Sequence, residues 1–355
     1  MGNEASAPAA QEVRLCRTED GLRLAWARHG SGPPLLIASC WLSNLQYDWQ
    51  SPIWRHFLDF LGTIATVYRY DERGFGLSDW DVTDFSFQAR LRDLETLVGN
   101  IGLDRFSMLG MSGGSPVALA YAAGHPERID RLVLYGALAS GCFGDTDDEA
   151  AEAGFEAMIR AGWARPEHLF RRVFTSVFIP DATEEQMTWL DELQRVSTST
   201  ENAVASRIAR RKIDVQSQLP LIAASTLVLH AREDQAAPFG WGPALSSAIA
   251  DARLVTLESK NHILLADEPA WTVFQDEVAH FLRTGEPDKS DITALSVRER
   301  ELLQLAATGL DNHAVADRLT LSVRTVERHF QNVYCKLDIS GHSARAAAVA
   351  RLLSQ

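Results

Sequence analysis

The feature that most constrains the fold is a short uncharged stretch, residues 106–115, which reads F-S-M-L-G-M-S-G-G-S. It begins as an apolar, strand-like run, passes through a G-x-S-x-G sequence centred on Ser112, and continues into an alanine-rich helical pattern over 116–123. A strand, a sharp turn that carries a serine, and a helix in this order form a nucleophile elbow. Glycines suit such a turn because it leaves no room for side chains beside the serine. Taken alone, the pattern equally fits a glycine-rich turn before a helix.

Apolar runs that read as strands recur on both sides of this elbow. Residues 12–30 alternate as two short strands around a turn, and 34–38 form a continuous apolar run of the kind that a buried parallel strand has. The remaining strand-like runs, separated by helical patterns of which the last covers about 268–282, are 66–70, 131–135, 226–230 and 252–257. Strands that alternate with helices predict an open parallel α/β sheet.

Residues 138 to about 218 interrupt this alternation and read as several amphipathic helices. They carry large apolar side chains, namely Phe155, Trp163, Phe170, Phe174, Phe178 and Trp189. Most of these are expected to pack the helices against one another. Because an insertion at this point of the sheet forms a lid over the serine, a few are also expected to line an apolar pocket.

Two further polar residues follow strand-like runs in a way that suits a nucleophilic serine. Ser112, Asp234 and His262 occur in the chain order serine, acid, histidine, each just after a predicted strand. The chemistry needs His262 to take the hydroxyl proton, and Asp234 to hold the imidazole tautomer and stabilise its charged form. A lone histidine after a strand is more often structural, but three such residues in this order rarely arise by accident. Glu233 is the alternative acid.

Residues 20–284 resemble the α/β-hydrolase fold family, whose D-x-R-G-x-G-x-S segment is matched by residues 71–78. The resemblance implies an α/β-hydrolase sheet with a helical cap, and it favours Asp234 over Glu233 as the acid. It further implies a serine hydrolase that acts on a carboxylic ester or a lactone. Neither a metal nor a cofactor is expected.

One position departs from the family pattern. The family usually has His-Gly after the third strand, before the residue whose backbone N–H helps to form the oxyanion hole, and this chain has Ser39-Cys40 there. By position Trp41 supplies that N–H, and Gly113, directly after the nucleophile, supplies the second. Losing one oxyanion donor lowers turnover by about 10²–10³. The sequence therefore leaves open whether the domain hydrolyses its ligand.

Residues 283–291 are polar and contain glycine and proline, which is typical of a linker, and the sequence beyond them is helical throughout. A capping box at 296–299 opens a first helix, which Gly309 ends. A second helix is predicted over 312–319. A short turn follows, and Ser322 caps a third helix.

The third of these helices has two distinct faces. Its apolar side chains recur at i, i+4, i+7 and i+11, as Val326, Phe330, Val333 and Leu337. Its polar side chains recur at i, i+3, i+4 and i+7, as Arg324, Glu327, Arg328 and Gln331. In the major groove arginine reads guanine, glutamine reads adenine and glutamate reads cytosine. Such a charged face is more often merely solvated, but the helix-turn-helix spacing favours DNA.

Residues 295–352 strongly resemble the LuxR-type helix-turn-helix family, from the L-S-x-R-E-x-E-L-L run to the Lys336-Leu337 pair. The resemblance implies that the polar face and Thr325 contact DNA, that Lys336 approaches phosphate, and that a last helix over 343–353 forms a dimer contact. The predicted organisation is a disordered leader (1–11), an α/β-hydrolase-fold domain (12–284, with its cap at about 138–218), a linker (285–292) and a LuxR-type helix-turn-helix domain (293–355).

Composition and charge distribution agree with this organisation. No run approaches the roughly 20 apolar residues of a membrane span. The four cysteines are scattered and lack metal-ligand spacing, which indicates reduced thiols in a cytoplasm. Residues 291–355 carry eight Lys and Arg against seven Asp and Glu, which is a net charge of +1. Since the whole chain has a net charge of −13, the remaining residues carry −14. Because an acidic body repels DNA, nucleic-acid contact is expected from the C-terminal segment.

Three functions are compatible with these features. The first is a sensor that binds a ligand without turnover and regulates transcription. The second is a transcription regulator that also hydrolyses its ester- or lactone-like ligand. The third is a serine esterase or lactonase with an accessory DNA-binding domain. The intact triad argues against the first, and the well-formed recognition helix argues against the third. The expected partners are double-stranded DNA, a small apolar ligand and a second copy of the chain in a homodimer.

Overall fold

The computed structural model describes residues 10–38, 40–141, 149–284, 295, 297–319, 321–337 and 344–353. The chain divides into two compact units, Met1–Gly285 and Glu286–Gln355, and each is described by itself. Most of the expected leader (residues 1–9) and all of the expected linker lie outside the described residues.

The first unit is built on a sheet that has eight strands in the described part of the chain, in the order β1-β2-β4-β3-β5-β6-β7-β8. β2 runs antiparallel to both of its neighbours, β1 and β4, and every pair from β4 to β8 is parallel. All six residues of the central strand β5 are buried, as its apolar sequence predicts. The strands are β1 (Glu12–Arg17), β2 (Arg23–Gly30), β3 (Pro34–Ala38), β4 (Thr66–Tyr70), β5 (Phe106–Met111), β6 (Ile129–Tyr135), β7 (Ser225–Ala231) and β8 (Ala252–Leu257). An α/β fold with a parallel core is therefore confirmed.

Helices cover both faces of this sheet. Because successive side chains of a strand point to opposite faces, Met108 joins one core and Leu109 the other. The core that contains Met108 is closed by α3 (Phe87–Ile101), α4 (Ser115–Gly124) and α9 (Trp241–Ala248). The core that contains Leu109 is closed by α2 (Arg55–Ile64) and α10 (Pro269–Thr284). A short helix α1 (Leu45–Asp48) follows the loop after β3.

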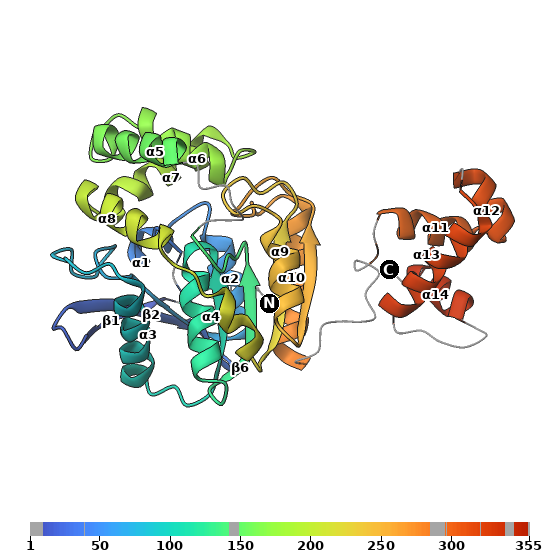
Figure 1. Cartoon of the computed structure of the whole chain (residues 1–355), viewed down its shortest axis with the longest axis horizontal. Coiled ribbons are helices and arrows are strands. Elements are labelled where there is room, and N and C mark those ends of the chain that lie inside the picture. The colour runs from blue at the N-terminus through green and yellow to red at the C-terminus, as the bar shows by residue number, and fades with distance from the viewer. Residues whose placement is uncertain are drawn as a thin grey trace, which may run out of the picture. The chain divides into compact units, whose positions relative to one another are not determined.

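The segment between β6 and β7 forms the expected helical cap, and Figure 1 shows its helices gathered in a layer of their own. Trp163 and Phe174 are buried there against Trp41 of the β3–α1 loop, with ring centroids 5.8 and 6.0 Å from its ring. Phe178 instead lines the pocket beside Ser112. The cap helices are α5 (Glu149–Gly162), α6 (Leu169–Phe178), α7 (Glu184–Ser197) and α8 (Thr200–Arg211), and the 3-10 helix η2 (Gln216–Leu221) that follows them packs against α4 and α9.

The second unit is a small helical bundle. Its elements are α11 (Val297–Ala307), α12 (Asn312–Leu319), α13 (Val323–Lys336) and α14 (Ala344–Leu353). Gly309, with φ +87°, follows the end of α11 as expected. Ser296 of the expected capping box and Ser343 at the expected start of the last helix lie outside the described residues. No helix in the described ranges of either unit is both long enough and apolar enough to cross a membrane.

Candidate active site

Ser112 lies directly after β5, at the start of a turn of 3-10 helix, η1 (Ser112–Gly114), that leads into α4. Its φ of +49° is positive, and among the described residues no other non-glycine residue shares this sign. Such strain in a serine is what a nucleophile elbow imposes. Ser115 stabilises the turn, because its hydroxyl donates to the Ser112 carbonyl oxygen at 2.5 Å and accepts from the Leu138 N–H at 2.9 Å.

The glycine before the serine is also required by packing. A Cβ on Gly110 would lie 2.8 Å from the Ala118 Cβ, a distance that real structures essentially never show. The close approach of β5 to α4 therefore depends on Gly110. The G-x-S-x-G pattern thus forms the strand, turn and helix that the sequence predicts.

Asp234 and His262 meet at the carboxyl ends of β7 and β8. The His262 Nδ1 lies 2.6 Å from the Asp234 Oδ2, and both side chains are almost fully buried. The other carboxylate oxygen accepts from the backbone N–H groups of Ala236 and Ala237 at 2.8 and 2.9 Å. Burial alone raises the pKa of Asp234, but the nearby His262 and these hydrogen bonds outweigh it and hold the pKa below its usual value. A carboxylate can only accept, so Nδ1 carries the proton and Nε2 is left as an acceptor.

His262 is held from three directions by groups that the sequence analysis missed. The Tyr135 hydroxyl donates to the His262 carbonyl oxygen at 2.7 Å, and the His262 N–H donates to the Phe178 carbonyl oxygen at 2.8 Å. A Cβ on Gly136, whose φ is +51°, would lie 2.8 Å from the His262 Cε1. The main chain of His262 is therefore held by β6 and by the cap, and Gly136 leaves room for the imidazole ring.

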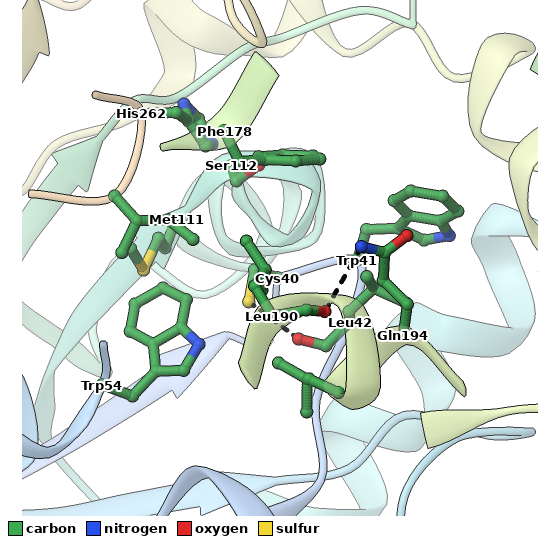
Figure 2. Close-up of a pocket in the computed structure, with 12 residues that line it drawn as sticks. Cys40, Trp41, Leu42, Trp54, Met111, Ser112, Phe178, Leu190, Gln194 and His262 are labelled. Carbon is green, nitrogen blue, oxygen red and sulfur yellow. Dashed lines mark hydrogen bonds between the residues drawn. The ribbon is translucent and has the colours of Figure 1, made fainter. Parts of the chain in front are cut away.

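Ser112 and His262 line the same pocket, which is small, about 30 Å³, and mostly apolar. Figure 2 shows the two side chains close to Phe178 and across the pocket from Leu42 and Gln194. The His262 Nε2 is buried and has no hydrogen-bond partner among the described residues. The lining residues are Cys40, Trp41, Leu42, Trp54, Met111, Ser112, Phe178, Leu190, Leu193, Gln194, His262 and Ile263.

The two residues predicted to form the oxyanion hole flank the serine. Trp41 lines the pocket and its ring packs into the cap, while Gly113 follows Ser112 in η1. Ser39 lies outside the described residues, but Cys40 is described. The Cys40 thiol donates to the Leu42 carbonyl oxygen at 3.2 Å, and burial raises its pKa to about 12. Cys40 is therefore a neutral thiol in the pocket wall and not a second nucleophile.

A buried charge cluster, also missed at the sequence level, links the cap to the elbow. Arg210 of α8 donates to the Gly113 carbonyl oxygen and pairs with Glu72 at 2.5 Å. Glu72 belongs to the segment 71–78 and lies 4.0 Å from Arg90 of α3. The only signal in the sequence is a charged residue at the variable position of the D-x-R-G motif. The hydrogen bond from Arg210 to the Gly113 carbonyl oxygen therefore joins cap helix α8 directly to the elbow turn.

In the second unit, the structure separates the two faces of α13 as the spacing predicts. Val326, Phe330, Val333 and Leu337 are buried in the core of the bundle, and Arg324, Glu327, Arg328 and Gln331 are exposed. Thr325 is half-buried, and its N–H donates to the Ser322 hydroxyl at 3.1 Å, which caps the helix. Lys336 ends α13, and its side chain lies outside what the structure describes.

Known protein families match both units. A family described as bacterial regulatory proteins, luxR family, matches residues 293–349. The alpha/beta hydrolase fold family matches residues 33–165, and a family described as TAP-like protein matches residues 200–294. The segment between the two hydrolase matches falls in the cap.

Individual proteins are similar to the chain at moderate identity. RutD of Rhizobium rhizogenes is 28% identical over 239 residues, which are 65% of this chain and 87% of that protein. A 2-hydroxy-6-oxo-6-phenylhexa-2,4-dienoate hydrolase of Comamonas testosteroni is 29% identical over 244 residues, 66% of this chain and 79% of its own. A crystal structure of a hydrolase from Pseudomonas aeruginosa superposes with a TM-score of 0.64 and 25% identity, covering 79% of this chain and 99% of that one. The protein therefore joins an α/β-hydrolase domain to a LuxR-type helix-turn-helix domain, in that order along the chain.

Proposed function

We propose that the protein is a transcription regulator whose hydrolase domain senses, and hydrolyses, a small apolar ester- or lactone-like ligand. The observation that carries this proposal is the joint position of Ser112 and His262 on one apolar pocket, with His262 already bonded to Asp234 at 2.6 Å. Binding alone requires neither a strained serine nor an oriented imidazole. The exposed polar face of α13 supplies the other half of the function.

The triad geometry supports acyl transfer through a covalent intermediate. Ser112 Oγ attacks the ligand carbonyl carbon while His262 Nε2 takes the hydroxyl proton, and the Asp234 carboxylate stabilises the imidazolium that forms. The backbone N–H groups of Trp41 and Gly113 are the proposed donors to the developing oxyanion. The imidazolium then protonates the departing alcohol. Water, activated by the same histidine, releases the acid and regenerates the serine.

In the second unit, the proposal assigns base reading to Arg324, Glu327, Arg328 and Gln331, with Thr325 beside them and Lys336 on phosphate. We further propose that the protein acts in the cytoplasm as a homodimer joined through α14. Sedimentation equilibrium of the full chain tests the dimer. A monomer at the concentrations that bind DNA would contradict it.

The decisive experiment measures operator affinity with and without ligand, in the wild type and in Ser112→Ala. The operator is selected from randomised duplex DNA, and the ligands are a panel of short p-nitrophenyl esters and aliphatic lactones. Removing the nucleophile should lower turnover by about 10⁶, whereas the lost hydroxyl should weaken ligand binding by only about 0.5–1.5 kcal/mol. If ligand occupancy of the pocket is the signal, Ser112→Ala retains ligand-dependent DNA binding. Its change in operator affinity should then last longer than that of the wild type, which hydrolyses the ligand.

Other outcomes identify the alternatives. If the product or the acyl-enzyme is the signal, Ser112→Ala binds ligand while its DNA affinity stays fixed. DNA binding that ignores ligand in both proteins, with hydrolysis intact in the wild type, would support a serine esterase or lactonase with an accessory DNA-binding domain. Ligand-dependent DNA binding without any turnover would identify a pure sensor.

A further inference from the structure

A second cavity lies behind the active-site pocket. It measures about 50 Å³, against about 30 Å³ for the pocket itself. Cys40, Trp54 and Met111 line both cavities, so these three side chains form the wall between them. The second cavity is lined by Ile37, Cys40, Ser43, Leu45, Asp48, Trp54, Phe57, Leu58, Leu61, Arg69, Tyr70, Leu109 and Met111.

One end of the second cavity is polar and incompletely satisfied. Asp48 and Arg69 both line it and are only 5% and 7% exposed. The Asp48 Oδ2 accepts from the Asn44 N–H at 3.2 Å and lies 3.8 Å from Arg69 Nη1, while Arg69 Nη2 donates to Gln11 at 2.9 Å. The Asp48 Oδ1 and the Arg69 Nε are buried and have no hydrogen-bond partner within the described ranges. Buried polar atoms of this kind are normally paired, so a polar group placed in this cavity would supply the missing partners.

We propose that this second cavity is a polar subsite for a ligand chain that ends in a hydroxyl group, with the apolar part of the chain in the pocket beside Ser112. The inference rests on the proposed function, because it identifies the ligand of the same site. Met111, a flexible side chain, is the part of the dividing wall most able to move aside.

The chemistry of Asp48 Oδ1 and Arg69 Nε favours a hydroxyl, and Ser43 Oγ, a third buried atom of the lining without a partner among the described residues, can donate to the same group or accept from it. A hydroxyl oxygen accepts from Arg69 Nε and its proton is donated to Asp48 Oδ1, so one group satisfies both. A carboxylate end group pairs with Arg69 but is repelled by Asp48, and an ammonium end group pairs with Asp48 but is repelled by Arg69. A ketone accepts from Arg69 but leaves Asp48 unpaired. A hydroxyl is also compact enough for a cavity of this size.

The test compares p-nitrophenyl ω-hydroxyalkanoates of increasing chain length with unsubstituted alkanoates of the same length. A purely apolar site penalises a hydroxyl, because the group loses its hydration without finding a partner. A hydroxyl that finds hydrogen-bond partners in the cavity should instead make the hydroxylated ester the better substrate. At one chain length, the hydroxylated ester should therefore exceed its plain counterpart about tenfold in kcat/KM, the effect of one well-placed hydrogen bond.

Two variants keep the test informative. Asp48→Leu removes the acceptor and should abolish the tenfold preference while hydrolysis of the plain esters continues. Since this change also unpairs Arg69 and can impair folding, Leu58→Phe is the second variant. It fills the cavity without altering either polar side chain, and it should remove the same preference. Asp59→Leu, at an exposed position of α2, is the matched control and should keep it.

Binding is measured separately from hydrolysis. Calorimetry on Ser112→Ala with the same esters should show the hydroxylated member of the best pair bound about tenfold more tightly. If no ester is cleaved but this binding preference appears, the hydrolytic part of the proposed function fails and the subsite stands. Equal or weaker binding of the hydroxylated ester, or no binding of either, would show that the cavity holds water only and would overturn the subsite.

Discussion

The hydrolase unit and the DNA-binding unit place their working side chains in opposite environments. In the hydrolase unit, Ser112, Asp234 and His262 come from the ends of three different strands, and Asp234 and His262 are only 7% and 2% exposed. In the DNA-binding unit, Arg324 and Arg328 lie on the solvent-exposed face of a single helix, α13.

This difference determines how each site responds to mutation. A buried constellation works only when every member is in place, because each group sets the protonation or position of another. An exposed row of side chains contributes contact by contact, and its energy depends on salt. Changes in the first unit should therefore cause large, cooperative losses of activity, while changes in the second should cause smaller and separable losses of DNA binding.

After the loss of the Ser112 hydroxyl itself, the largest expected effect is that of Asp234→Asn. The amide preserves the shape of the carboxylate but no longer stabilises the imidazolium, and it permits the wrong tautomer of His262. Ester turnover should fall by about 10⁴, as in a comparable triad. Steady-state kinetics on a p-nitrophenyl ester measure this, with Asp267→Asn at an exposed position as the control. A loss of less than tenfold would show that Asp234 is not the triad acid.

Gly136→Ala tests whether activity depends on the room that Gly136 leaves for the His262 ring, in addition to the charge of Asp234. The new Cβ would lie 2.8 Å from the His262 Cε1, at a φ of +51° that disfavours any side chain. Displacing the imidazole should reduce kcat/KM by about 10². Gly99→Ala provides the control, because no heavy atom lies within 4 Å of its Cβ. Unchanged kinetics in Gly136→Ala would mean that the ring position is not critical.

The same contrast explains what the sequence could predict. The strands, the elbow and the order Ser112, Asp234, His262 follow from local patterns, and the structure brings Asp234 and His262 together. The groups that hold His262 in place could not be predicted from these local patterns. Phe178 acts through its backbone carbonyl, which leaves no trace in residue type, and Tyr135 reaches a partner 127 positions away. Arg210 and Glu72 are 138 positions apart, so only the folded cap reveals their pairing.

In the second unit, local periodicity was enough to predict the arrangement of α13. Four residues of one face are buried and four of the other are exposed because a single helix fixes both sets. The helical periodicity fixes which residues face outward, and it does not fix which bases they read. The base preference is therefore open to mutation experiments.

A smaller effect is expected when DNA reading is disturbed. Arg328→Ala should reduce discrimination between the selected operator and a mismatched one by about 1–3 kcal/mol. Lys336→Ala should instead weaken binding to all sequences alike and lower the salt dependence by about one unit. Fluorescence anisotropy over a range of salt concentrations separates the two effects. Arg300→Ala, at an exposed residue of α11, is the control. Unaltered operator preference in Arg328→Ala would remove that residue from base reading.

An effect of similar size concerns stability and pH, and it should be confined to the hydrolase unit. Burial raises the pKa of Asp48 from 3.8 to about 7, against the opposing effect of the Arg69 charge. Between these two pH values the folded chain binds more protons than the unfolded one, so the Asp48 contribution to the free energy of unfolding falls as pH rises from about 4 to about 7.

Asp48→Asn removes this titration and should flatten the pH dependence, since each unit of pKa shift corresponds to about 1.4 kcal/mol. Between pH 5 and pH 8, the difference in unfolding free energy between wild type and variant should change by roughly 2–3 kcal/mol. Urea denaturation followed by tryptophan fluorescence measures it, because all nine tryptophans lie before residue 285 and report only the hydrolase unit. Asp59→Asn, exposed and paired with Arg55, should leave the curve unchanged. Parallel pH curves for wild type and Asp48→Asn would show that Asp48 does not titrate in this range. The stability data would then give no evidence that a buried carboxylate behaves differently from an exposed one.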